Sequence, residues 1–105
     1  MKKIMLPSIY SEYPNFVITA KEGYIQPIHA KNPKKGFSLD EMQQIVGGYI
    51  QMVDISGRRK MVLNEEGKIH GLSFNEKATH FWEEKYGKTD MIVGNVLIMT
   101  RGGKE

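Results

Sequence analysis

The chain has 105 residues, 40% hydrophobic and 26% charged, with a formal net charge of +3 at pH 7. This length fits one compact domain, and it has no cysteine, which excludes disulfides, thiolate metal sites and cysteine nucleophiles. The charge is smaller than that of a typical protein that binds nucleic acid with its whole surface.

Residues 1–14 are expected to form an irregular lead. Their apolar run is too short for a signal peptide or a membrane span, which favours a cytoplasmic protein without a membrane partner. Tyr10, Tyr13 and Pro14 are more typical of a packed lid or an interface than of a platform for stacking bases.

Two strands are predicted next, at residues 15–19 and 23–29, with a hairpin-like turn between them. Proline cannot donate a ladder hydrogen bond, so Pro27 places the second strand at a sheet edge. The lysines at residues 31–35 lie in a stretch that we interpret as a flexible connection to the first helix.

Ser38 begins this helix, because Ser38 and Glu41 have the spacing of a capping box. Apolar residues then recur at helical spacing as far as Val46, and Gly47-Gly48 ends the helix.

A pair of strands is predicted at residues 49–55 and 60–63, joined by a turn at Ser56-Gly57. Residues 64–67, Asn-Glu-Glu-Gly, then form a hairpin turn, because Asn64 and Gly67 are residue types that tolerate positive φ. The two glutamates are interpreted as solvated acids, although an acid/base pair or a Mg²⁺ site is the alternative.

The second helix is predicted from its cap at Asn75 to Tyr86. Residues 90–100 form the last strand, which is almost continuously apolar and is therefore expected to be central and covered on both faces, with a bulge or turn at Gly94-Asn95. Residues 101–105 are expected to be a flexible tail.

The predicted order is β-β-α-β-β-α-β, in a single α+β domain over residues 1–105. We expect a mainly antiparallel sheet with both helices on one face. A second copy would then cover the opposite face or a sheet edge, which predicts a homo-oligomer.

Several segments together resemble a family of small domains of unknown function encoded by phages, plasmids and other mobile elements. The resemblance covers roughly the C-terminal two-thirds of the chain, a length typical of one small domain, and implies a genomic context but no established activity. Residues 1–13 fall outside it. The segments that carry it are Val46-Gly47-Gly48-Tyr49-Ile50, Asn64-Glu65-Glu66-Gly67-Lys68, Gly71-Leu72, Asn75, Ala78-Thr79 and Ile92-Val93-Gly94-Asn95-Val96-Leu97.

Catalytic and metal-binding patterns are missing from the sequence. The three histidines, His29, His70 and His80, do not have metal-ligand spacing, and no nucleophile–base pair is apparent. Gly47-Gly48 matches neither a P-loop nor a dinucleotide fingerprint. We therefore expect no metal, no cofactor and no enzymatic activity, with a small enzyme as the weakest alternative.

The favoured hypothesis is a non-catalytic binding module that counters host defence, most concretely by sequestering a small anionic ligand such as a nucleotide signal. Guanidinium groups suit phosphate, amides suit base edges and an aromatic ring suits stacking. The alternative is an inhibitor that binds a host protein or nucleic acid through its surface. The predicted ligand-binding residues are Arg58, Arg59, Asn64, Gly47, Gly48, Tyr49, Asn75 and Thr79.

Overall fold

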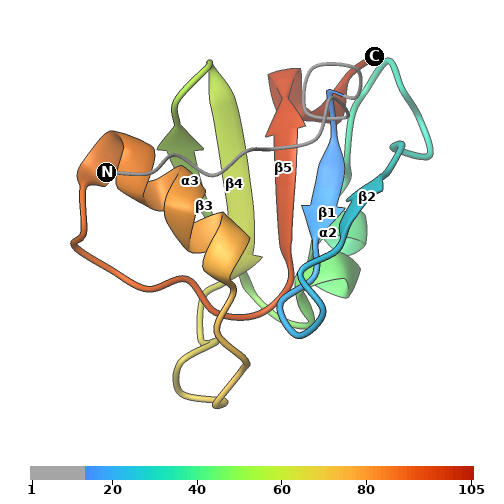
Figure 1. Cartoon of the computed structure of the whole chain (residues 1–105). Coiled ribbons are helices and arrows are strands. Elements are labelled where there is room, and N and C mark those ends of the chain that lie inside the picture. Colours follow the sequence, from blue (N-terminus) through green and yellow to red (C-terminus); the bar gives the residue numbers. More distant parts are fainter. Residues whose placement is uncertain (1–13) are drawn as a thin grey trace.

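The computed structural model describes residues 14–105, and these contain the predicted order of five strands and two helices (Figure 1). The sheet is antiparallel throughout, in the order β2-β1-β5-β4-β3. The elements are β1 (Phe16–Ile18), β2 (Ile25–Pro27), α2 (Leu39–Val46), β3 (Ile50–Ile55), β4 (Arg59–Asn64), α3 (Glu76–Tyr86), β5 (Val96–Thr100) and the 3₁₀ turn η1 (Arg101–Gly103).

Helix α2 begins and ends as the sequence predicts. The Ser38 hydroxyl accepts a hydrogen bond from the Glu41 amide at 3.1 Å, and the Glu41 carboxylate accepts one from the Ser38 amide at 3.0 Å. Gly47 ends the helix in the left-handed region at φ 80° and ψ 28°, a conformation that glycine adopts without steric cost.

Strand β5 lies at the centre of the sheet and is buried on both faces, as predicted (Figure 1). Val96 and Ile98 belong to one hydrophobic core, which includes residues of α3, and Leu97 and Met99 belong to a second core, which includes residues of α2. Successive side chains of a strand point to opposite faces, so one apolar run supplies both cores.

The helices therefore cover opposite faces of the sheet, and the expectation that both lie on one face is wrong. Figure 1 shows α3 in front of the sheet and α2 behind it. Each helix is amphipathic by itself, and neither pattern specifies which face of the sheet it covers. The face that we expected a second copy to cover is occupied by a helix of the same chain.

The last strand is shorter than predicted, because it begins at Val96 instead of Asp90. Before it, Val93 forms an isolated bridge with Phe74, and the Gly94 amide donates to the Ser73 carbonyl at 2.8 Å. Gly94 has φ 80°, which confirms a turn at this point.

Residues 101–105, for which the sequence predicted a flexible tail, pack against earlier parts of the chain. The Phe37 amide donates to the Gly102 carbonyl at 2.9 Å, and the Glu105 amide donates to the Pro33 carbonyl at 2.8 Å. The Glu105 carboxylate also lies 2.6 Å from His29 Nδ1. These contacts join the segment after β5 to the connection that precedes α2.

The Asn-Glu-Glu-Gly turn differs from its prediction in two respects. It leads from β4 toward α3 and so does not join two strands of a hairpin. Neither Asn64 nor Gly67 has a positive φ. Gly67 is required for space, because a Cβ at this position would lie 2.9 Å from the Val93 side chain.

Candidate functional site

Four of the predicted site residues lie together at the junction between α2 and β3: Gly47, Gly48, Tyr49 and Asn64. Asn64, only 6% exposed, donates from Nδ2 to the Val46 carbonyl at 3.2 Å and accepts from the Glu66 amide at 2.8 Å. Gly48 leaves space for this amide, since a Cβ there would lie 3.0 Å from Asn64 Nδ2. Asn64 thus connects the end of α2 to the end of β4, and its amide is engaged inside the fold.

A hollow of about 350 Å³ opens beside this junction. Tyr49 lines this hollow, and 66% of its surface is exposed. The Tyr49 carbonyl accepts a hydrogen bond from the Glu65 amide at 2.8 Å. His70 Nε2 lies 3.9 Å from the Glu66 carboxylate. The negative charges of Glu65 and Glu66 make this end of the β3–β4 hairpin unsuitable for binding phosphate. The lining residues are Gln43, Gly48, Tyr49, Asn64, Glu66 and His70.

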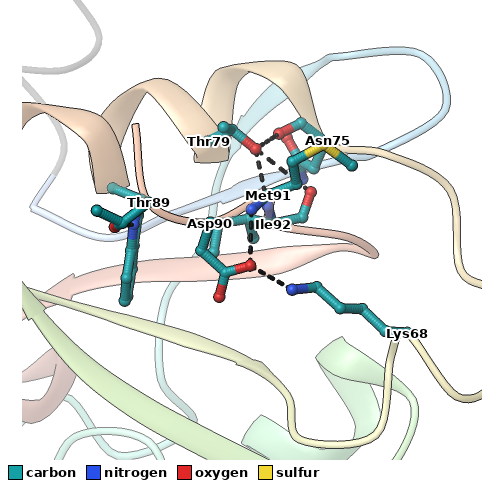
Figure 2. Close-up of polar contacts among 8 residues, drawn as sticks. Lys68, Asn75, Thr79, Thr89, Asp90, Met91 and Ile92 are labelled. Carbon is teal, nitrogen blue, oxygen red and sulfur yellow. Dashed lines mark hydrogen bonds and ion pairs between the residues drawn. The ribbon is translucent and has the colours of Figure 1, made fainter. Parts of the chain in front are cut away.

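Asn75 and Thr79 form a buried polar network beneath the start of α3. Figure 2 shows the Thr79 hydroxyl between the Asn75 carbonyl, to which it donates at 2.8 Å, and the Ile92 amide, from which it accepts at 2.9 Å. The Asn75 side chain caps α3 by accepting from the Ala78 amide at 3.0 Å. Its Nδ2 donates to the carbonyls of Ile18 and Gly94, so the amide joins three separate segments.

Asp90 holds the exposed end of the loop that carries Ile92. Figure 2 shows the Asp90 carboxylate between the Lys68 ammonium group and the Met91 amide. The hydrogen bond from Lys68 lowers the pKa of Asp90 below its ordinary value of 3.8, and the Met91 amide acts in the same direction. This ion pair fixes the loop that carries Ile92 to the network of Asn75 and Thr79.

Arg58 and Arg59 lie at the opposite end of the β3–β4 hairpin, beside a hollow of about 450 Å³ that we call the basic hollow. Arg58 has φ 59°, the only positive φ outside glycine in residues 14–105, and its side chain is exposed. Arg59 donates to the Pro14 carbonyl at 2.9 Å and lies over the Phe16 ring, 5.8 Å from its centroid. The lining residues are Asp54, Ile55, Ser56, Gly57, Arg58, Arg59, Lys60 and Lys85.

Four cationic residues and one carboxylate therefore lie among the described residues that line the basic hollow. Lys60 forms an ion pair with Asp54 at 2.6 Å. The pKa of Asp54 is lowered from its ordinary value of 3.8, first by the hydrogen bond from Lys60 and then by the charges of Lys60 and Lys85. Even with Arg59 left aside, the positive charges of Arg58, Lys60 and Lys85 outnumber the negative charge of Asp54 among the described lining residues, and this excess favours anions.

Aromatic side chains on α3 support this end of the hairpin. The Tyr86 hydroxyl donates to the Asp54 carbonyl at 2.7 Å, and its ring stacks on Trp82 with centroids 4.2 Å apart. Lys85 lies 5.6 Å from the Tyr86 ring centroid. Through these contacts the last turn of α3 brings Lys85 to the arginine-bearing turn.

The structure does not assemble all eight predicted residues into one site. β4 runs from Arg59 to Asn64, and its five residue steps separate the two by about 17 Å. Asn75 and Thr79 are buried and form a third location, with their polar groups engaged in the fold. Only Arg58 and Arg59 lie beside a cationic hollow.

Sequence reasoning missed Lys85 as a neighbour of the arginines. The last turn of α3 reaches the β3–β4 turn only through tertiary packing, for which the local sequence contains no signal. Lys60 was visible in the Arg58-Arg59-Lys60 run, but its pairing with Asp54 depends on the strand register, in which the two residues are direct partners.

Within residues 14–105, no cluster of three or more His, Asp or Glu side chains is arranged to hold a metal ion. None of the helices in this part of the chain combines the length and the apolar character that crossing a membrane requires.

Fold and site together define a small α+β domain with a charged surface hollow. Residues 15–105 match the model of a domain of unknown function, DUF3846, and the chain belongs to this family. Comparisons with curated proteins and with solved structures found no match.

Proposed function

We propose that this domain is a non-catalytic binding module that holds a small phosphate-bearing ligand in the basic hollow, with a nucleotide signal as the most concrete ligand. The observation that carries this proposal is the presence of Arg58, Arg59, Lys60 and Lys85 among the residues that line one hollow. Guanidinium groups bind phosphate through two parallel hydrogen bonds, and an ammonium group adds a point charge.

Helix α3 supports binding because it fixes one wall of the hollow. The hydrogen bond from Tyr86 to the Asp54 carbonyl holds the helix against β3. Lys85 is thereby kept beside the arginine-bearing turn, and a preorganised site loses less entropy when its ligand binds.

The biological setting that we propose is a phage, a plasmid or another mobile element, in whose host the module would remove a nucleotide signal used in defence. The motif resemblance of Val46–Ile50 and Asn64–Lys68 to domains from such elements motivates this setting. Sequestration needs binding and no chemical step.

Calorimetric titration of the full chain with AMP, ATP and a cyclic dinucleotide tests the proposal. We expect Arg58→Ala to weaken binding by about 1.5–3 kcal/mol, the range for hydrogen bonds to charged groups. Lys85→Ala should weaken binding in the same sense, with little change in melting temperature because its side chain is exposed.

The matched control is Lys34→Ala, on the exposed connection before α2 and outside the basic hollow. It should leave binding unchanged. If none of the three nucleotides binds the wild type, the proposal is wrong, and a host protein or nucleic acid becomes the ligand class to test.

A further inference from the structure

The two edges of the sheet differ in their capacity to pair with another strand. β2 has three residues and ends at Pro27, which has no amide hydrogen to donate. β3 has six residues, and within residues 14–105 it pairs with β4 alone. An edge of this length offers a row of backbone donors and acceptors to a further strand.

Charge is distributed unevenly along the β3–β4 hairpin. One end has the cations of the basic hollow, Arg58, Lys60 and Lys85 among them. The other end has the acidic turn, which we define as Glu65 and Glu66, joined to Tyr49 by the hydrogen bond from the Glu65 amide. The hairpin thus has a positive end and a negative end about 17 Å apart.

A two-fold axis perpendicular to the sheet would place two β3 strands side by side and antiparallel. Each basic hollow would then lie beside the acidic turn of the other copy, so that opposite charges meet twice. A parallel arrangement would instead bring like charges together. The charge distribution therefore favours a second copy of this chain, antiparallel, as the occupant of the edge.

The register of such a pair is limited by the faces of the strand. Two residues that lie opposite each other, one in each β3 strand, must point to the same face of the sheet. The two-fold axis therefore passes beside Met52 or Val53, near the centre of β3. Tyr49 of one copy then lies opposite the partner's Ile55 or the partner's Gly57. In both registers an exposed tyrosine lies next to the partner's basic hollow, whose described lining residues include no aromatic side chain.

We infer that the protein forms a two-fold dimer through β3, in which the partner's Tyr49 completes each basic hollow. The role of Tyr49 as part of a ligand site rests on the proposed function; the pairing itself rests on the edge and the charges. Arg58 and Tyr49 were both predicted as ligand residues, and the dimer places them together although one chain holds them apart.

Exposed apolar side chains beside the edge are consistent with this interface. Met52 on β3 is 41% exposed. Ile69 and Met91, 81% and 58% exposed, line one hollow together with Gln51 of β3. Burial of these side chains in the dimer would add hydrophobic stabilisation to the strand pairing.

Sedimentation velocity of the full chain at low and high salt tests the pairing. We expect a dimer that weakens as salt screens the opposed charges. Arg58→Glu and Glu65→Arg should each raise the dimer dissociation constant by on the order of tenfold or more, because each brings like charges together.

The double variant, Arg58→Glu with Glu65→Arg, exchanges the two charges and should restore dimerisation. The two residues lie at opposite ends of the hairpin within one chain, so restoration requires contact between two chains. Lys34→Glu and Glu22→Arg, two exposed charge reversals outside β3 and β4, are the matched controls and should leave the constant unchanged.

The absence of cysteine allows a second test that needs no ligand. Tyr49→Cys and Ser56→Cys, mixed as separate chains with a short bismaleimide, should give a crosslinked dimer. Glu22→Cys mixed with Tyr49→Cys should give none. A wild type that stays monomeric at micromolar concentration, or a dimer that fails both the charge exchange and the crosslink, overturns the inference.

The two proposals can fail separately. A dimer that passes both tests but binds none of the three nucleotides overturns the proposed function and leaves the pairing in place. A monomer that still binds a nucleotide through Arg58 overturns the pairing alone.

Discussion

Asn75 and Asn64 show what a buried amide does in this domain. Each accepts a hydrogen bond from a nearby backbone amide and donates to carbonyls that lie far away in the sequence, Asn75 to those of Ile18 and Gly94, and Asn64 to that of Val46. An amide in this position replaces water for carbonyls that have lost access to solvent, and removing it leaves them unsatisfied.

Asn75→Ala is therefore expected to lower the free energy of unfolding by about 3 kcal/mol, through loss of the helix cap and of two buried hydrogen bonds. Chemical denaturation measures this change. The matched control is Gln44→Ala, an exposed amide on α2, which should change stability by about 0.5 kcal/mol or less. An equal effect of both variants would contradict the structural role of Asn75.

Sequence patterns identified the helix cap at Asn75 but not the buried hydrogen bonds that the two asparagines donate to distant carbonyls. Asn75 was predicted both as a helix cap and as a ligand-binding amide, and its cap is confirmed. The partners of Nδ2, at Ile18 and Gly94, lie 57 and 19 residues away. A local pattern cannot show that distant carbonyls approach a side chain, so a buried amide and an exposed one look alike in the sequence.

At the scale of the element, α2 shows how far local signals extend. The capping box and the terminal glycine specify both ends of the helix, and both are confirmed. The face of the sheet that α2 covers is set by the path of the chain from β2, at one edge, to β3, at the other. This is a property of the whole topology, which explains why the bounds were predictable and the layer arrangement was not.

The cap of α2 also makes stability depend on pH. Amide hydrogen bonds from Ser38 and Lys31 lower the pKa of Glu41 from its ordinary value of 4.5. A carboxylate with a lowered pKa in the folded state contributes stability above the ordinary pKa and loses it as the pH falls through the folded value. Asp54 and Asp90, with lowered pKa values of their own, act in the same direction.

Glu41→Gln should reduce this dependence. Melting temperatures measured from pH 6 down to about pH 3, which spans the ordinary carboxylate range, should fall less steeply for the variant than for the wild type. Glu84→Gln, an exposed change on α3 away from this cap, should retain the wild-type slope. Identical slopes for all three proteins would mean that Glu41 is not held by the cap.

On the scale of the whole molecule, the connection before α2 and the segment after β5 pack against each other beside the second core. Phe37 is buried in that core, and Gly103 approaches its ring so closely that a Cβ would overlap it. Gly103 also has φ 87°, which disfavours any side chain. This close approach joins two parts of the chain more than sixty residues apart.

Gly103→Ala should therefore destabilise the domain through both steric overlap and backbone strain, by about 3 kcal/mol. Gly71→Ala is the matched control, because Gly71 has φ 67° but no atom within 4 Å of the added Cβ. Its cost should be about 1 kcal/mol, from strain alone. Equal losses of melting temperature would show that Phe37 does not constrain Gly103.

The central place of β5 has a consequence for the order of folding. β5 follows every other strand in the sequence, yet it alone connects the β1–β2 hairpin to the β3–β4 hairpin. During synthesis the two hairpins are made first, and neither core can close before β5 emerges from the ribosome. The domain should thus fold only after translation has passed Thr100, and ribosome-bound chains that stop before Val96 should remain open to proteases.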